Sequence, residues 1–101
     1  MESVMIHGKQ WFDKSAGVTY FSARVMVDGK EVARLPFQQG YGSQYVYEAQ
    51  KALTSLNLIP DNARPLWTLR DNLGIAIYEV LEADLSKREV VGWGKEWEKV
   101  A

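Results

Sequence analysis

The chain has 101 residues, 47% of them hydrophobic, with 12 basic and 13 acidic side chains and a formal net charge of −1. At this length we expect one domain, residues 1–101, with a single core. The balanced charge excludes a global field toward nucleic acid or an anionic membrane, so any such binding has to be local. Cysteine is absent, which excludes disulfides and thiolate chemistry.

No apolar run approaches the ~20 residues of a membrane-spanning helix. Residues 1–3 also lack the basic-then-apolar pattern that begins a signal peptide. We therefore expect a soluble, cytoplasmic protein with no membrane partner.

Three antiparallel strands are predicted before the first helix. Residues 4–12 form the first, and residues 13–17 have turn composition. Strict alternation of side chains over 19–27 predicts a second, half-buried strand. The alternation resumes after Asp28-Gly29 and ends near Pro36, which cannot donate to a strand ladder.

The loop between the second and third strands decides which side chains share a face. A two-residue Asp28-Gly29 turn would place Arg34 on the face that buries Phe21. A three-residue loop, Val27-Asp28-Gly29 with Gly29 left-handed, keeps one face apolar, so we expect that loop. Its pairs are Val25 with Glu31, Ala23 with Ala33 and Phe21 with Leu35.

A main helix is predicted after Gly40-Tyr41-Gly42, with Ser43 as its N-cap and an end near Leu56. An apolar stripe would lie across the apolar face of the sheet. The stripe consists of Tyr45, Ala49, Ala52, Leu53 and Leu56. The fold class is therefore α+β, with a three-stranded antiparallel sheet followed by a main helix (βββα).

The remainder should add a short helix and one or two further strands. Pro65 in a first turn and Gly74 just past the end suit a short helix. The periodicity of residues 75–85 fits either a strand or a helix, and the turn-like residues 86–88 favour a strand. Val90-Val91 would be a short partner strand, and a flexible C-terminal tail is expected over 93–101.

Residues with catalytic or metal-binding chemistry are scarce, so we expect no catalytic site, no metal and no cofactor. His7 is the single histidine and has no metal ligand at suitable spacing, so a surface or strand-edge role is expected for it. On a strand, Glu79 would face opposite to Glu82 and Asp84, which favours solvated charges over a carboxylate pair.

Gly42 and Ser43 are candidate anion contacts. Free amides and the dipole at the start of a helix both favour an anion there. A phosphate-binding loop would need a longer glycine spacing and a Lys before the Ser or Thr. A tight loop with an N-cap is therefore the preferred interpretation.

Aromatic side chains are the candidates for an interaction surface. Tyr41 lies between two glycines and Tyr47 lies off the apolar stripe, so both rings should point away from the core. Trp93, also between glycines, and Trp11 complete the set. Exposed aromatic residues commonly anchor protein interfaces. In the alternative reading, Tyr41 and Trp93 fold back over the helix ends.

The runner-up function is nucleic-acid binding by aromatic stacking. The rings would be Trp11, Tyr41 or Trp93, flanked by Lys9, Lys14 and Lys95. The third hypothesis is a small enzyme with an unrecognised site.

The order strand, Val27-Asp28-Gly29-Lys30, strand, loop and helix over residues 20–56 resembles the C-terminal half of the double-stranded-RNA-binding domain. That family places lysines at the start of its second helix, whereas the positions here are Ser43, Gln44, Tyr45, Val46 and Tyr47, followed by Glu48. Only Lys51 remains, and the family's first helix is absent. The resemblance implies shared geometry, and double-stranded RNA is not an expected partner.

Four runs resemble a group of small uncharacterised proteins encoded by phages and prophages. The runs are Lys9–Lys14, Thr19–Ser22, Val27–Lys30 and Pro36–Tyr45. The group offers no activity to transfer. Its setting implies an accessory role in a bacterial cytoplasm through contact with a host or phage protein, with inhibition of a host defence system as one form. A homodimer is a further expectation.

Overall fold

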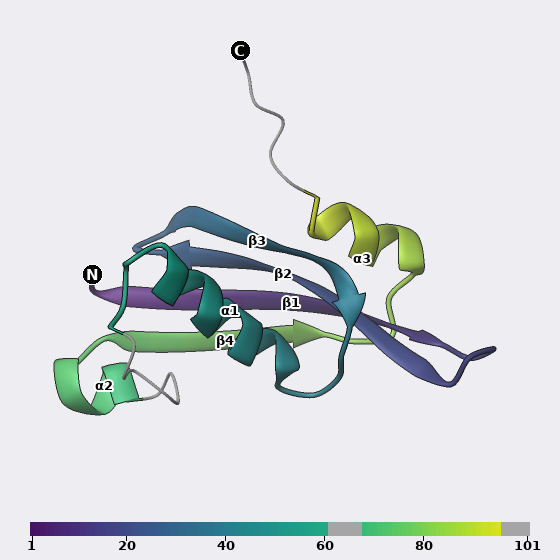
Figure 1. Ribbon diagram of the computed structural model, residues 1–101, viewed down its shortest axis with the longest axis horizontal. Coiled ribbons are helices and arrows are strands. Elements are labelled where there is room, and N and C mark those ends of the chain that lie inside the picture. The colour runs from purple at the N-terminus through teal and green to yellow at the C-terminus, as the bar shows by residue number, and fades with distance from the viewer. Residues whose placement is uncertain (61–67, 96–101) are drawn as a thin grey trace, which may run out of the picture.

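The structure is a computed structural model that describes residues 1–60 and 68–95. Its elements are β1 (Ser3–Asp13), β2 (Val18–Val27), β3 (Lys30–Gln39), α1 (Gln44–Ser55), α2 (Thr68–Leu73), β4 (Ala76–Glu82) and α3 (Lys87–Trp93). Three antiparallel strands, a main helix, a short helix and a further strand follow one another, so the predicted α+β fold is confirmed (Figure 1).

The strands form one sheet in the order β3-β2-β1-β4. The pairs β1–β2 and β2–β3 are antiparallel, whereas β4 runs parallel to β1. A parallel neighbour needs a long crossover. The chain therefore passes through α1 and α2 before β4 begins beside β1 (Figure 1). This crossover places β1 in the interior of the sheet.

The core lies between α1 and one face of the sheet. Tyr45, Ala49 and Leu53 of the predicted stripe are buried, whereas Leu56, just past the helix, is 49% exposed. The sheet contributes Val4, Ile6, Phe21, Ala23, Val25 and Leu35. Gly8 makes room for the Tyr45 ring, because a Cβ at this position would lie 2.7 Å from Cδ2 of Tyr45.

The turn between β2 and β3 has two residues, so the predicted three-residue loop is wrong. Val27 pairs with Lys30 across Asp28 and Gly29, whose φ angles are 51° and 81°. Positive φ at both central residues is typical of a type I′ turn. The Asp28 carboxylate also accepts hydrogen bonds from the amides of Glu2 and Ser3 at 2.7 and 2.9 Å.

Register shifts explain how a two-residue turn still leaves one apolar face. The pairing shifts between Met26 and Val25, so that Val25 lies opposite Ala33 instead of Val32. A β-bulge of this kind reverses which side chains of one strand face the core. Arg34 therefore lies opposite Arg24, away from α1. The prediction failed because it considered only regular registers.

The C-terminal elements agree in part with the sequence. A short helix, α2, ends before Gly74, whose φ is 67°, and β4 confirms a strand within 75–85. Pro65 lies outside the described residues. The strand expected at Val90-Val91 is wrong, because both residues belong to α3.

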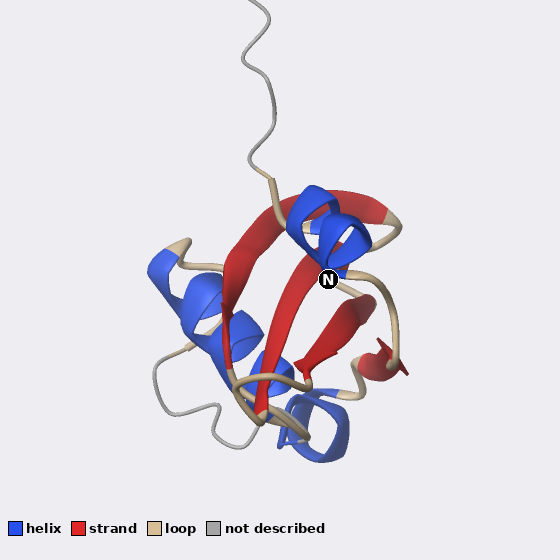
Figure 2. Cartoon of the chain, turned by 90° about the vertical axis from the view of Figure 1, so that its right-hand side faces the viewer, coloured by secondary structure: helices blue, strands red, loops and turns tan. Residues whose placement is uncertain are grey.

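Ser86 caps the start of α3. The Ser86 hydroxyl accepts a hydrogen bond from the Glu89 amide and donates to the Glu89 carboxylate. One of the amides left free at the start of a helix is thereby satisfied. α3 packs on the face of the sheet opposite α1 (Figures 1 and 2).

The left-handed Gly29 gives a test of the turn. Replacing Gly29 with Val should lower the free energy of unfolding by about 1–2 kcal/mol, because a side chain is strained at positive φ. Gly29→Asn is the control and should lose less, since Asn tolerates this conformation. Chemical denaturation measures both. Equal midpoints for the Val variant and the parent chain would contradict this turn geometry.

Candidate functional site

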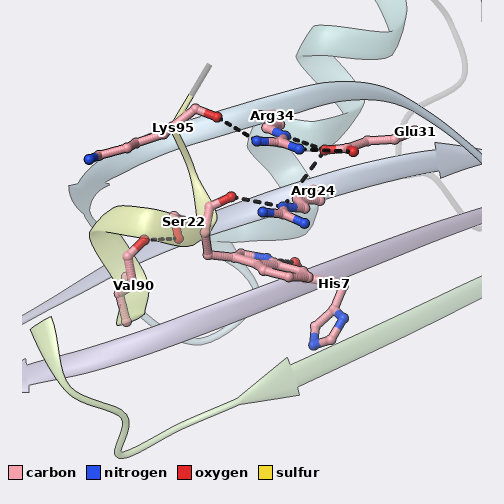
Figure 3. A network of polar contacts seen from close by, with 8 residues as sticks. His7, Ser22, Arg24, Glu31, Arg34, Val90 and Lys95 are labelled. Carbon is pink, nitrogen blue, oxygen red and sulfur yellow. Dashed lines mark hydrogen bonds and ion pairs between the residues drawn. The ribbon is translucent and has the colours of Figure 1, made fainter. Parts of the chain in front are cut away.

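Hydrogen bonds between side chains and carbonyl groups attach α3 to the sheet (Figure 3). The Ser22 hydroxyl donates to the carbonyl of Val90. Nε of Arg24 donates to the carbonyl of Trp93, and Nη1 of Arg34 to that of Lys95, each at 3.0 Å. The last carbonyls of a helix have no partner within it, and cations there also complement the helix dipole. The two arginines therefore cap the end of α3.

Glu31 organises the two arginines (Figure 3). Arg34 donates from Nε and Nη2 to the two carboxylate oxygens, and Nε of Arg24 lies 3.7 Å from the nearer one. The contact with Glu31 raises the pKa of Arg34. One carboxylate thus holds two neighbouring cations in the positions that α3 requires.

Trp93, predicted as part of an interaction surface, packs against the sheet. Its indole Nε1 donates to the carbonyl of His7 at 2.8 Å. The ring meets His7 edge-on at 4.7 Å between centroids, and the Arg24 guanidinium lies 3.8 Å from the ring centroid. The Trp93 ring therefore packs on β1 and β2, whereas the alternative placed it over a helix end. Of the tail expected over 93–101, Trp93 and Lys95 are held by these contacts, and residues 96–101 lie outside the described part.

His7 lies on β1 with its side chain 20% exposed, and β1 is an interior strand instead of an edge. Its Nε2 is 3.2 Å from the Glu82 carboxylate, and Nζ of Lys9 is 3.4 Å from the same carboxylate. The contacts with His7 and then Lys9 hold the pKa of Glu82 below its ordinary value. Glu82 is therefore a charged partner of two side chains on β1.

Glu79 lies on the other face of β4. Burial and, to a smaller degree, the charge of Glu79 raise the pKa of Tyr45 in the core layer. Glu79 and Glu82 therefore act on different sides of the sheet, as the alternation along a strand predicts. They do not form a carboxylate pair.

Tyr41 and Tyr47 lie near the start of α1 and are 79% and 47% exposed. Both residues are therefore exposed, as expected from the sequence, Tyr41 largely and Tyr47 about half. Nζ of Lys51 lies 5.1 Å from the Tyr47 ring centroid and 3.4 Å from the Glu48 carboxylate. Gln44 donates to the same carboxylate at 3.1 Å. The surface around Tyr47 is therefore polar with its charges paired.

Gly42 and Ser43 form the approach to α1, with φ of 62° at Gly42. The Ser43 side chain makes no capping hydrogen bond, although Ser43 occupies the predicted N-cap position. The amides of Val46 and Tyr47 donate to the carbonyl of Ser43, and the amide of Gln44 to that of Tyr41. An anion would compete with these bonds only at the amides of Gln44, Val46 and Tyr47, so the anion contact at Gly42 and Ser43 stays a prediction.

Trp11, the last predicted surface residue, belongs to a row of three half-buried rings across β1, β2 and β3. Trp11 stacks on Tyr20 at 5.6 Å between centroids, and Tyr20 stacks on Phe37 at 4.9 Å. Nζ of Lys87, from α3, lies 5.5 Å from the Trp11 ring. The sequence singled out Trp11 alone; the pairing of Trp11 with Tyr20 across β1 and β2 could have indicated a row.

Gly94 provides a test of the attachment of α3. A Cβ there would lie 2.4 Å from the Leu35 carbonyl oxygen and 2.6 Å from Cβ of Ser22. Since a main-chain oxygen cannot move aside cheaply, Gly94→Ala should destabilise the protein by about 1–3 kcal/mol in a denaturation titration. Gly92→Ala is the matched control, because among the described residues no atom outside its own helix backbone and chain neighbours lies within 4 Å of that Cβ position. It should stabilise α3 by about 0.5–1 kcal/mol. Shifts in the same direction would contradict this packing.

Within residues 1–60 and 68–95, no group of three or more His, Cys, Asp or Glu side chains could hold a metal ion. No helix in that part of the chain is long and apolar enough to cross a membrane. Comparison with protein-family models, with curated proteins and with solved structures finds no match to this chain.

Proposed function

We propose that this protein acts without catalysis, by binding another protein through the surface around Tyr41 and Tyr47. The exposure of Tyr41 carries the proposal, because 79% of this large residue lies in solvent instead of covering the end of α1. A tyrosine ring contributes a large apolar area with few rotatable bonds to lose on binding, which is why tyrosine is enriched at interface hot spots.

The charges around the two tyrosines favour a protein partner over a nucleic acid. Lys51, the cation beside Tyr47, is paired with Glu48. A surface that grips phosphates needs cations available to replace counterions. Paired charges around exposed rings instead match a protein interface, where aromatic anchors are surrounded by polar contacts.

The resemblance to small phage and prophage proteins supports a setting for this interaction. The run Pro36–Tyr45, one of the four that carry the resemblance, includes Tyr41. We place the protein in a bacterial cytoplasm, with a host or phage protein as its partner. Inhibition of a host defence system is the most specific form of the proposal.

The experiment is a capture of partners from nuclease-treated bacterial lysate, followed by titration of the purified partner. Tyr41→Ala with Tyr47→Ala should weaken binding about thirtyfold or more, since truncating a hot-spot residue costs about 2 kcal/mol or more. The thermal midpoint should stay unchanged, because both rings are exposed.

Tyr78→Ala is the matched control. Tyr78 is 56% exposed but lies on β4, away from the start of α1, so its loss should leave partner binding intact. Full binding by the double variant would contradict the proposed surface. A lowered thermal midpoint in the double variant would show that the two rings are structural.

A further inference from the structure

A basic hollow lies along the side of α3 that faces away from the sheet. It has a volume of about 520 Å³ and is lined by Lys87, Arg88, Val91, Gly92 and Lys95. The buried Val90 and the packed Trp93 occupy the other side of the helix. Among the described residues, the lining thus combines three cations with a small apolar residue and a glycine.

These cations differ from most others in the described chain, which are paired with carboxylates. The paired cations are Lys9, Arg24, Arg34, Lys51 and Arg70. Lys87, Arg88 and Lys95 have no carboxylate oxygen within 4.0 Å among residues 1–60 and 68–95. Within the described ranges, the hollow therefore gathers positive charge that no carboxylate within 4.0 Å neutralises.

Two acidic side chains of the described part near Lys87, Glu89 and Asp13, are hydrogen-bonded to serines. The Glu89 carboxylate accepts a hydrogen bond from the Ser86 hydroxyl. The Ser15 hydroxyl and amide donate to the Asp13 carboxylate. The pKa of Asp13 is lowered mainly by the hydrogen bond from the Ser15 hydroxyl. The charge of Lys87 lowers it least. An added anion would therefore meet available cations in the hollow.

Lys87 connects the hollow with the aromatic row. Lys87 lines the hollow and also lies 5.5 Å from the Trp11 ring, which begins the stack that Tyr20 and Phe37 continue. Binding sites for single-stranded nucleic acid combine two parts, cations and a partly exposed aromatic ring. The cations bind the backbone and the rings stack on bases.

We propose that the α3 hollow and the Trp11 ring form a second binding site, whose ligand is single-stranded nucleic acid. The phosphates would lie against Lys87, Arg88 and Lys95, and an unpaired base would stack on Trp11. A duplex fits less well, because its bases are already stacked and paired. This site is separate from the Tyr41 surface and does not depend on it.

The test is fluorescence anisotropy of a labelled oligothymidine of about 12 nucleotides, titrated with the full chain at salt concentrations from about 50 to 200 mM. Three phosphate contacts predict a slope of log K against log salt of about −2, from about −0.7 for each contact on a single strand. The triple variant Lys87→Gln, Arg88→Gln, Lys95→Gln should lose at least tenfold in affinity at the lowest salt, and its slope should approach zero.

A triple variant with the same charge change is the matched control. Lys30→Gln, Lys51→Gln and Arg70→Gln remove three exposed cations away from α3, and should leave the affinity within about twofold of the parent and the slope near −2. Trp11→Leu should weaken binding but keep the slope. A duplex of the same length should bind more weakly than the single strand.

Three results would overturn the proposal. The first is a parent chain that does not bind the oligothymidine, and the second is equal loss in the two triple variants. The third is tighter binding of an oligoglutamate peptide than of the oligonucleotide, which would assign the hollow to an acidic protein segment. The charge variants keep the test decisive even if Trp11→Leu fails to fold.

Discussion

The alternation of side chains along β1 is the constraint that connects the two layers of this protein. Val4, Ile6 and Gly8 face α1, whereas His7 and Lys9 face Trp93 of α3. β1 can serve both layers because it is paired on both sides, with β2 and with β4. A register slip of one residue would exchange the two sets and bury cations in the core. The pairing of β1 therefore fixes both helices at once.

The bulge in β3 extends this constraint to the arginines. In the regular two-residue register, Arg34 would lie on the core face, where an unpaired cation costs several kcal/mol. The register of β3 against β2 shifts between Met26 and Val25. This shift places Arg34 beside Arg24, where Glu31 binds both arginines. From there the two guanidinium groups reach the end of α3. A local irregularity in one hairpin thus makes the attachment of a helix about 60 residues later possible.

The sequence predicted those parts of the fold whose signals are local. Alternation over 19–27 predicted a strand, and the apolar stripe that starts at Tyr45 predicted α1. The position of Tyr41 between two glycines predicted its exposure. α3 was missed because the β-branched pair Val90-Val91 favours a strand by propensity. Ser86 and Glu89 have the S-x-x-E spacing that is typical of the start of a helix, and this pattern is visible in the sequence. The packing of Trp93 could not be read locally, since the bond to His7 spans 86 residues.

A net charge of −1 describes this surface poorly, because ion pairing sorts the charges by location. Around α1, Lys51 and Glu48 neutralise each other beside the exposed Tyr47. Along α3, Lys87, Arg88 and Lys95 have no ion pair among the described residues, and Lys87 lies beside Trp11. The helices lie on opposite faces of the sheet, so a ligand on one does not cover the other (Figure 2). The end of β3 links the two surfaces: Phe37 ends the aromatic row, and the Gly40 amide is bound to the Thr19 carbonyl just before Tyr41. The same backbone thus positions the rings of both surfaces, and of the two it is the one beside α3 whose lysines and arginine lie in no ion pair within the described residues.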